Sequence, residues 1–438
     1  MGIRPSIYNT INIQKDDRIV DIRLATASIA FYEDILSPNI TAKIQIVDVG
    51  GSTKLAGTGE SLSLYEAMKV RGGEAVSIFI EPNSDSTLGI DLTENPLYVN
   101  SIKNVIREGN KEFFNMNLIS RSGFDNEKNF IGEAFSENVG ISEHVRTIVN
   151  KYFPYDSNNL DIDTTANKYG VIGNLRKPFN LLLDLASRSV FNRSETSSSA
   201  GFLFFQTLEK TYFKAIDNLV KSPVKAYLYY AEADGNSLTG DNTDYRILKY
   251  EIIKNQSIIS NMRKGAYSTS RTFFDPVTHG VTDRDFDFTG AQYENKMDTL
   301  NDPISPEDRS IAFDSVSLDY IPTKIITETI DRGTNTKDVT TDQSKYIESY
   351  LSQRKVRYNS LFSQIISVQI ASNTNIHAGD VIECNLPKLN GNVESAEYDY
   401  EQLSGKYLVK EVCHYFDSRG SYTSMKLVRD SFGFDTSS

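Results

Sequence analysis

The feature that most constrains the fold of this chain is the alternation of apolar and polar residues in short segments. Residues 40–48 alternate in this way and lead into Gly50 and Gly51, which is typical of a half-buried strand that ends in a turn. Further alternating segments lie at residues 74–81, 97–106 and 112–120. Successive side chains of a strand point to opposite faces, so the pattern predicts one antiparallel β unit up to about residue 122, with one face buried. A short helix is expected to interrupt this unit at residues 61–68.

The alternating pattern returns near the C-terminus as a repeat of the first unit. Two pairs of segments align at nearly the same separation: residues 70–80 with 376–386, and residues 113–119 with 422–428. The first pair places Gly73 on Gly379, each directly before an acidic residue. Chance similarity between two antiparallel sheets is the alternative, but the matched order and spacing favour a duplication. The expected fold class is β-rich α+β, with two tandem tube-like antiparallel β-barrel domains and α+β insertions between them.

The residues between the two repeats follow a different pattern. Helical periodicity predicts helices at residues 141–153, 178–186, 246–262 and 345–357, and a strand hairpin is expected at residues 202–216. The polar, proline-containing stretch 275–342 predicts extended loops. We therefore expect four parts: a first tube-like β-barrel domain at residues 1–122, an α+β insert domain at 123–217, a helix and long-loop segment that packs on the barrels at 218–344, and a second tube-like β-barrel domain at 345–438.

Composition excludes several classes of protein. The 438 residues include 46 Lys and Arg against 58 Asp and Glu, a formal net charge of −12, which excludes a generally basic nucleic-acid binder. No apolar run is long enough to cross a bilayer and the amino terminus lacks a signal-peptide core, so we expect synthesis in a cytoplasm and no membrane anchor. Two cysteines are too few for a disulfide framework in a chain of this size.

Few residues of the chain form catalytic or metal-binding patterns. The strongest candidate ligands for a metal are His377, Cys384, Cys413 and His414. Cys413 and His414 are adjacent on a predicted strand and so point to opposite faces, which argues against a shared metal. The sequence contains no Gly-rich phosphate loop or nucleophile elbow, and its many carboxylates do not single out a catalytic pair. We therefore expect no catalytic, cofactor-binding or metal-binding residues and no cofactor, and we interpret the chain as a binding or structural protein.

Three parts of the sequence together resemble the central baseplate hub proteins of contractile-tailed bacteriophages. They are spread over most of the chain and comprise residues 31–48, then 201–207 with 212–216, and finally 377–382 with 405–410 and 412–415. The resemblance implies two tube-like barrels interrupted by α+β insertions, and a homotrimer whose six barrels form a pseudo-hexameric ring. Two similar domains in one chain make such a ring geometrically available.

The resemblance also implies a function. In that family the ring joins the hexameric tail tube protein to the trimeric central spike protein, contacts neighbouring baseplate proteins and lines the DNA channel without catalytic activity. DNA then passes through the lumen without sequence-specific binding, which suits an acidic chain. The expected location is the virion tail baseplate, after synthesis and assembly in the host bacterial cytoplasm.

One segment is a candidate contact between subunits, because barrels of this family reach their neighbours through a loop between strands. It consists of Phe31, Tyr32, Glu33, Asp34, Ile35 and Leu36. Replacing Tyr32 by Asp is then expected to weaken the ring without unfolding the monomer. Two other functions remain open from the sequence alone. One is a tail-associated cell-wall hydrolase, which needs a carboxylate pair in a cleft, and the other is a carbohydrate-binding β protein, which the absence of Trp disfavours.

Overall fold

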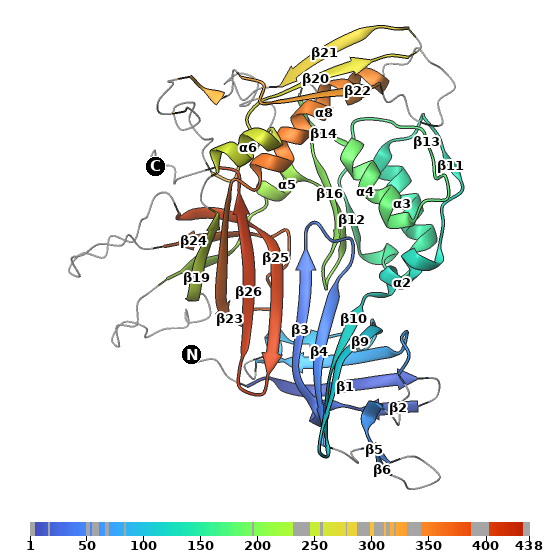
Figure 1. Cartoon of the computed structure of the whole chain (residues 1–438), viewed down its shortest axis with the longest axis vertical. Coiled ribbons are helices and arrows are strands. Elements are labelled where there is room, and N and C mark those ends of the chain that lie inside the picture. Colours follow the sequence, from blue (N-terminus) through green and yellow to red (C-terminus); the bar gives the residue numbers. More distant parts are fainter. Residues whose placement is uncertain are drawn as a thin grey trace, which may run out of the picture.

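The structure is a computed structural model of the chain. It describes residues 5–15, 18–49, 53–54, 61–65, 70–82, 85–194, 197–230, 246–254, 257–276, 278–286, 298–301, 311, 316–318, 321–330, 334, 343–386 and 403–431. Antiparallel strands dominate it, with a cluster of helices to one side of the main sheet (Figure 1). The predicted β-rich α+β fold class is confirmed.

The N-terminal part consists of strands with two short 3₁₀ helices between them. In chain order these are β1 (Ile7–Lys15), β2 (Arg18–Asp21), η1 (Arg23–Ala25), β3 (Thr26–Asp34), β4 (Thr41–Asp48), β5 (Thr53–Lys54), β6 (Ser61–Leu62), β7 (Ala75–Glu81), η3 (Ser86–Leu88), β8 (Ile90–Asp91), β9 (Leu97–Glu108) and β10 (Lys111–Ile119). The helix predicted at residues 61–68 starts too early, because Ser61–Leu62 pairs with Thr53–Lys54 as a strand, but Leu64 and Tyr65 are helical as expected. Residues 66–69 lie outside the described part of the chain.

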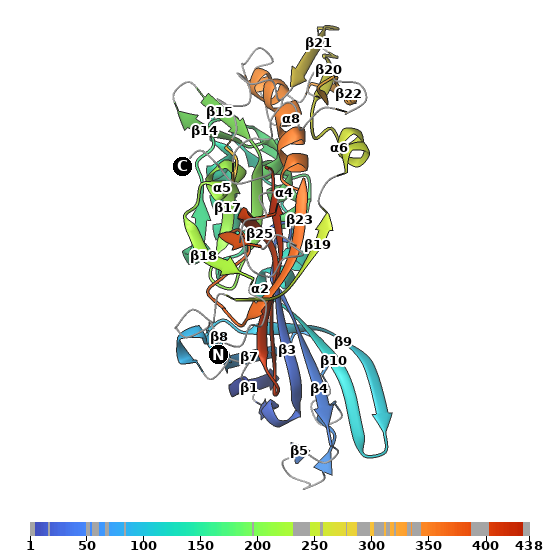
Figure 2. The same cartoon turned by 90° about the vertical axis from the view of Figure 1, so that its left-hand side faces the viewer.

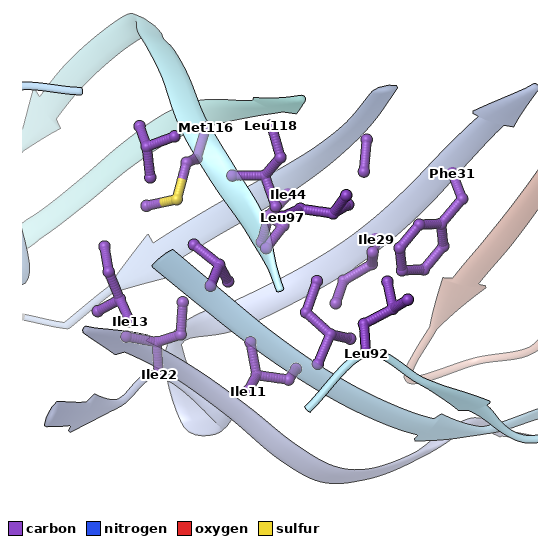
Figure 3. Close-up of a cluster of buried hydrophobic side chains, with 14 of the residues drawn as sticks. Ile11, Ile13, Ile22, Ile29, Phe31, Ile44, Leu92, Leu97, Met116 and Leu118 are labelled. Atoms are coloured by element: carbon purple, nitrogen blue, oxygen red, sulfur yellow. The ribbon is translucent and has the colours of Figure 1, made fainter. Parts of the chain in front are cut away.

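Alternation along these strands produces a core between two layers. Every second residue of β7 is buried, and the same holds for β4 and β10. Ile11 of β1 packs with Ile29, Ile44 and Met116 from the layer of β3, β4 and β10 (Figure 3), and Ile78 of β7 belongs to the same cluster. Burial of these apolar side chains is the main stabilising term for this part of the chain.

The middle of the chain forms a separate core of helices and short strands. Its elements are α2 (Arg121–Lys128), β11 (Ala134–Phe135), α3 (Ile141–Tyr152), η4 (Ser157–Asn159), β12 (Leu160–Ile162), β13 (Val171–Ile172), α4 (Pro178–Arg188), β14 (Val190–Ser194), β15 (Ser197–Ala200), β16 (Phe202–Gln206), β17 (Thr211–Ala215) and α5 (Ile216–Val220). The helices predicted at residues 141–153 and 178–186 are present as α3 and α4. Helix α4 begins with Pro178, and the missing N–H of proline costs no hydrogen bond there, because N–H groups in the first turn have no acceptor within the helix. The predicted hairpin is β16 and β17, whose Phe202, Phe204 and Phe213 lie in this core.

The remaining elements complete a second strand layer and a small separate sheet. They are β18 (Val224–Tyr229), β19 (Ile247–Lys254), α6 (Ile258–Lys264), β20 (Thr269–Phe274), β21 (Val281–Phe286), β22 (Lys324–Thr329), α8 (Gln343–Ser360), β23 (Gln364–Ala371), β24 (Val381–Asn385), β25 (Gly405–Asp417) and β26 (Ser421–Arg429). Apolar residues from β18, β24 and β25 pack against those of β23 and β26 to form the C-terminal core.

Two expectations about residues 246–342 are corrected by the structure. The helix predicted at residues 246–262 is instead strand β19 followed by helix α6, because β19 pairs along its length with β23. The spacing of Ile and Tyr in this segment fits the period of a helix as well as that of a strand, and pairing with a neighbouring strand decides between the two structures. The stretch 275–342 was expected to be loop, but β21 and β22 flank β20 in a three-stranded sheet.

A single sheet runs through both ends of the chain. Its strands follow the order β19-β23-β26-β25-β3-β4-β10-β9-β7-β1-β2, and from β19 to β9 they succeed one another from left to right in Figure 1. Within it, β7-β9-β10-β4-β3 and β24-β25-β26-β23-β19 are linked in the same order. We call these two series the first and the second strand set. Their common pairing order supports the duplication inferred from the sequence.

The turn that opens each repeat also has the same local structure. Gly73 has a φ of 87° and Gly379 a φ of 95°, a left-handed conformation that glycine adopts without strain. The acidic residue after each glycine accepts a hydrogen bond from the backbone N–H three residues before it: Glu74 from Arg71, and Asp380 from His377. A Cβ atom at Gly379 would also lie 2.8 Å from the ring of Phe205, so this turn requires glycine.

A buried ion cluster fastens α8 to the second strand set. Arg357 of α8 is fully buried and donates to Asp430, just after β26, at 2.6 Å. Its guanidinium also lies 3.1 Å from a carboxylate oxygen of Asp217 in α5 and donates to the carbonyl of Asp298. Buried charges are tolerated because they are paired in this way.

This cluster leads to a stability prediction. Asp430→Asn removes one charge that faces Arg357 and is expected to lower the free energy of unfolding by about 3 to 5 kcal/mol, because a buried cation then lacks part of its compensation. Asp21→Asn, which breaks the exposed pair with Arg23, serves as the control and should leave the unfolding midpoint unchanged. Urea denaturation followed by circular dichroism measures both. Equal midpoints for the two variants would contradict the assigned role of the cluster.

Candidate functional site

The junction between the two strand sets contains the candidate contact residues Phe31 to Leu36 that were predicted from the sequence. Strands β3 and β25 pair antiparallel from Ser28 opposite Asp417 to Asp34 opposite Glu411. The backbone N–H of Ile35 extends the pairing by donating to the carbonyl of Lys410 at 3.0 Å. We call this strand pair the seam. It joins residues from opposite ends of the chain into one hydrogen-bonded ladder.

The buried side of the seam contains aromatic and charged residues. The rings of Phe31 and Phe416 meet edge to face with 6.0 Å between centroids. Next to Phe31 on the same face lies Glu33, which is 2% exposed although it is a carboxylate. A buried carboxylate requires hydrogen-bond donors, and two separate parts of the chain supply them to this one.

Glu33 is the common acceptor for those donors. The backbone N–H of Leu208, in the turn between β16 and β17, donates to it at 2.7 Å. From the turn before β24, the N–H of Ala378 donates at 3.0 Å and the ring of His377 is 3.1 Å away through Nδ1. The other ring nitrogen of His377 lies 3.3 Å from Glu209. The cluster therefore ties the seam, the insert hairpin and the repeat turn together.

The charges in this cluster follow from burial and from its partners. Burial by itself opposes the charge on Glu33, but the hydrogen bond and the charge of His377 outweigh it and lower the pKa of Glu33 below its usual value. Burial likewise opposes a charge on His377, but Glu33 raises the pKa of His377 to about 8. Burial dominates at His414, also behind the seam, and lowers its pKa to about 4. At neutral pH the cluster thus holds one ion pair beside a neutral histidine.

This arrangement is suited to holding elements together rather than to turning over a substrate. Both oxygens of the Glu33 carboxylate accept hydrogen bonds from within the chain, so neither is left directed at an external ligand. A general base needs a lone pair that can reach a substrate proton. We therefore interpret Glu33 and His377 as residues that hold the seam, the insert hairpin and the repeat turn together.

The candidate inter-subunit residues Phe31 to Leu36 occupy this same place. They belong mainly to strand β3 and not to a loop, which corrects that part of the expectation, because β4 and β25 pair on either side of β3. Phe31, Glu33 and Ile35 are buried within the chain, whereas Asp34 is half-buried. Tyr32 and Leu36 are 42% and 47% exposed. Contact with another subunit stays a prediction, now confined to those two exposed side chains.

The opposite face of the sheet is polar from one strand set to the other. Side chains at alternate positions there are exposed or half-buried, and they include Asp34, Thr41, Lys43, Gln45, Asn115, Asn117, Ser367, Gln369, Glu411, Cys413, Ser424 and Lys426. Uncharged amides and hydroxyls alternate with both signs of charge. We call these polar side chains the polar face. They lie on both sides of the seam, where the exposed ring of Tyr32 shares the same surface.

The candidate metal ligands do not converge. Cys384 is fully buried in the C-terminal core, and Cys413 and His414 point to opposite faces of β25, Cys413 to the polar face and His414 inward. His377 packs edge to face on His414 with 6.3 Å between ring centroids. Within the described ranges no group of three or more His, Cys, Asp or Glu side chains is placed to hold a metal ion.

No helix in the described part of the chain combines the length and the apolar character needed to cross a bilayer.

The Glu33 cluster was missed at the sequence level, although a signal for it was present. In the alternating segment that becomes β3, Glu33 occupies a position of the inward-facing series together with Phe31 and Ile35. An acidic residue in a buried series indicates a paired carboxylate. Its partner His377 lies 344 positions away, and nothing in the sequence links the two.

Comparisons with known proteins bear on the fold. No protein-family model matches the sequence, and no curated protein matches it. The solved structures that match over nearly their whole length include two tail proteins. The tail protein from Neisseria meningitidis MC58 has 9% sequence identity and a TM-score of 0.53, with 97% of each chain covered. The 43 kDa tail protein of prophage MuSo2 from Shewanella oneidensis has 11% identity and a TM-score of 0.53, with 98% of this chain and 100% of that chain covered. The chain therefore shares its fold with phage tail proteins.

The raised pKa of His377 predicts how stability depends on pH. The unfolded-state pKa is near 6.5 and the folded-state pKa about 8, so the protonated ring favours the folded state. That contribution is complete below pH 6.5 and is lost as the pH rises through 8. We expect the urea midpoint of the wild-type chain to fall over this interval and that of His377→Gln to change less. Parallel midpoint curves for the two proteins would contradict the pairing of His377 with Glu33.

Proposed function

We propose that this chain is the central hub of a phage tail baseplate, a structural virion protein that forms a homotrimer. The single observation that carries the proposal is the presence of two strand sets with one pairing order in a continuous sheet. Three copies would present six similar units in a ring. Such a ring matches a sixfold partner on one side while remaining threefold on the other.

The partners follow from that symmetry. A hexameric tail tube protein fits the sixfold side, a trimeric central spike protein fits the threefold side, and neighbouring baseplate proteins would contact the periphery. The fold shared with two tail proteins supports a place in the tail. In this proposal, the barrels predicted at residues 1–122 and 345–438 form the ring. Strands β18 and β19, from the segment predicted at 218–344, belong with the second barrel because they pair with β24 and β23.

The polar face supports a channel that DNA passes through. Its uncharged amides and hydroxyls are mixed with side chains of both charge signs, so it lacks the dense positive charge that retains a phosphate backbone. The net charge of −12 disfavours retention of DNA further. The polar face is accordingly assigned to the lumen, with no catalytic step and no cofactor.

Solution mass tests the proposal. Multi-angle light scattering on the purified chain is expected to give three times the monomer mass, either for the chain alone or after addition of the spike protein encoded with it. A chain that remains monomeric under both conditions would contradict the hub. If such a monomer released products from peptidoglycan or bound glycans saturably, the hydrolase or carbohydrate-binding interpretation would replace the hub.

A further inference from the structure

Strands β9 and β19 of the continuous sheet each have a long edge that no other described strand covers. Strand β19 pairs with β23 on one side, and from residue 247 to 254 no strand of the described chain pairs on its other side. Strand β9 pairs with β10 along its length, but with β7 only at Leu97 and Tyr98. The backbone of Val99 still bonds to Gly73 and Glu74, and beyond it β9 extends with β10 as a hairpin away from the body (Figure 2). Long uncovered edges invite pairing with another chain.

The exposed residues on these edges are partly apolar. Val105 and Ile106 of β9 are 41% and 58% exposed, and Ile252 and Ile253 of β19 are 43% and 49% exposed. Consecutive apolar residues at an uncovered edge are a liability for a monomer. Burial of both pairs would remove this apolar surface from water.

The seam shows which strands fit together. Strand β25 is the second member of the second strand set, as β9 is the second member of the first. Strand β3 is the last member of the first set, as β19 is the last member of the second. In the seam, the second strand of one set therefore pairs with the last strand of the other set. Strands β9 and β19 are the second and the last strand that remain without such a partner.

Strand direction agrees with this pairing. Eight strands, all antiparallel to their neighbours, lie between the uncovered edges, so β9 runs opposite to β19. If copies are related by rotation about an axis roughly along the strands, β19 of the next copy lies antiparallel to β9. The contact is head-to-tail and closes when three copies have been joined.

We propose that β9 of one copy pairs antiparallel with β19 of the next copy, repeating the seam between subunits. The inference rests on the proposed ring and identifies the surface that forms it. Three copies would then close a cylinder of three times eight strands with the polar faces directed inward. No strand of that cylinder would retain an open edge.

The internal repeat also predicts the register. Met116 pairs with Ile102 of β9, and its counterpart Met425 pairs with Val412 of β25. Ile102 therefore corresponds to Val412, and Lys103 corresponds to Cys413.

The same comparison places the partner residue on β19. Ile29 of β3 and Tyr250 of β19 correspond. Each pairs with a residue of the neighbouring strand, β4 or β23, and that residue pairs in turn with Met116 of β10 or Met425 of β26. Tyr32 then corresponds to Ile253, which lies at an irregularity of the ladder between Ile252 and Lys254. Cys413 pairs with Tyr32 in the seam, so Lys103 of one copy is expected opposite Ile252 or Ile253 of the next.

Disulfide cross-linking tests this register directly. In a Cys413→Ser background, Lys103→Cys is combined with Ile252→Cys or with Ile253→Cys, two positions that point to opposite faces. Under mild oxidation one of these pairs should give covalent dimer and trimer at least tenfold more efficiently than the matched pair Lys103→Cys with Leu248→Cys. Comparable yields from all three pairs would overturn the proposed pairing.

A mixing experiment provides a second measurement. The variant Val105→Asp/Ile106→Asp keeps an intact β19, and the variant Ile252→Asp/Ile253→Asp keeps an intact β9. Each should be monomeric alone, and an equimolar mixture should stop at the dimer, because only one productive edge pair remains. Leu183→Glu, on the exposed side of α4 and away from both edges, is the control and should assemble like the wild-type chain. Circular dichroism confirms that each variant is folded.

The outcomes separate this inference from the hub proposal. A wild-type trimer whose edge variants also form trimers would overturn the edge pairing and leave the ring intact. A wild-type chain that stays monomeric at every concentration, with and without spike protein, would contradict both.

Discussion

The antiparallel pairing of β3 with β25 is the interaction on which the rest of the structure depends. Backbone groups of a strand inside a sheet must be bonded on both sides, and β3 obtains its second partner only from the far end of the chain. This ladder brings the N-terminal and C-terminal cores together and makes one sheet of two strand sets. The polar face and the positions of the uncovered edges both follow from it.

The seam is specified by a buried charge as well as by backbone hydrogen bonds. Glu33 is satisfied only when the insert hairpin and the turn at His377 and Ala378 are both in place. A shifted register would leave a carboxylate buried without donors, which costs more than a missing apolar contact. The cluster thus selects one arrangement of three segments.

Much of the fold could be predicted from the sequence because period-two alternation and the Gly-acid turns are local signals. They located the first β unit and the repeat around Gly73 and Gly379, and helical periodicity, which is also local, located the insert helices α3 and α4. Strand β19 was predicted as a helix, since its apolar spacing fits both periods and only β23 decides between them. The seam and the Glu33–His377 pair were not predictable, because they join residues more than 300 positions apart and no local pattern records such contacts.

The separation within the seam also has a consequence for biosynthesis. Lys410 and Asp34, which meet at the seam, are 376 residues apart, so β3 leaves the ribosome long before β25 exists. At ordinary translation rates the delay is roughly 20 to 80 s. During that time β3 has a hydrogen-bonding edge with no native partner, and Phe31 and Ile35 lack the contacts that Phe416 and other C-terminal residues of their cores supply. Nascent chains on neighbouring ribosomes would expose the same edge together, so the yield of this protein should depend on the spacing of translating ribosomes and on chaperones that shield an unpaired strand.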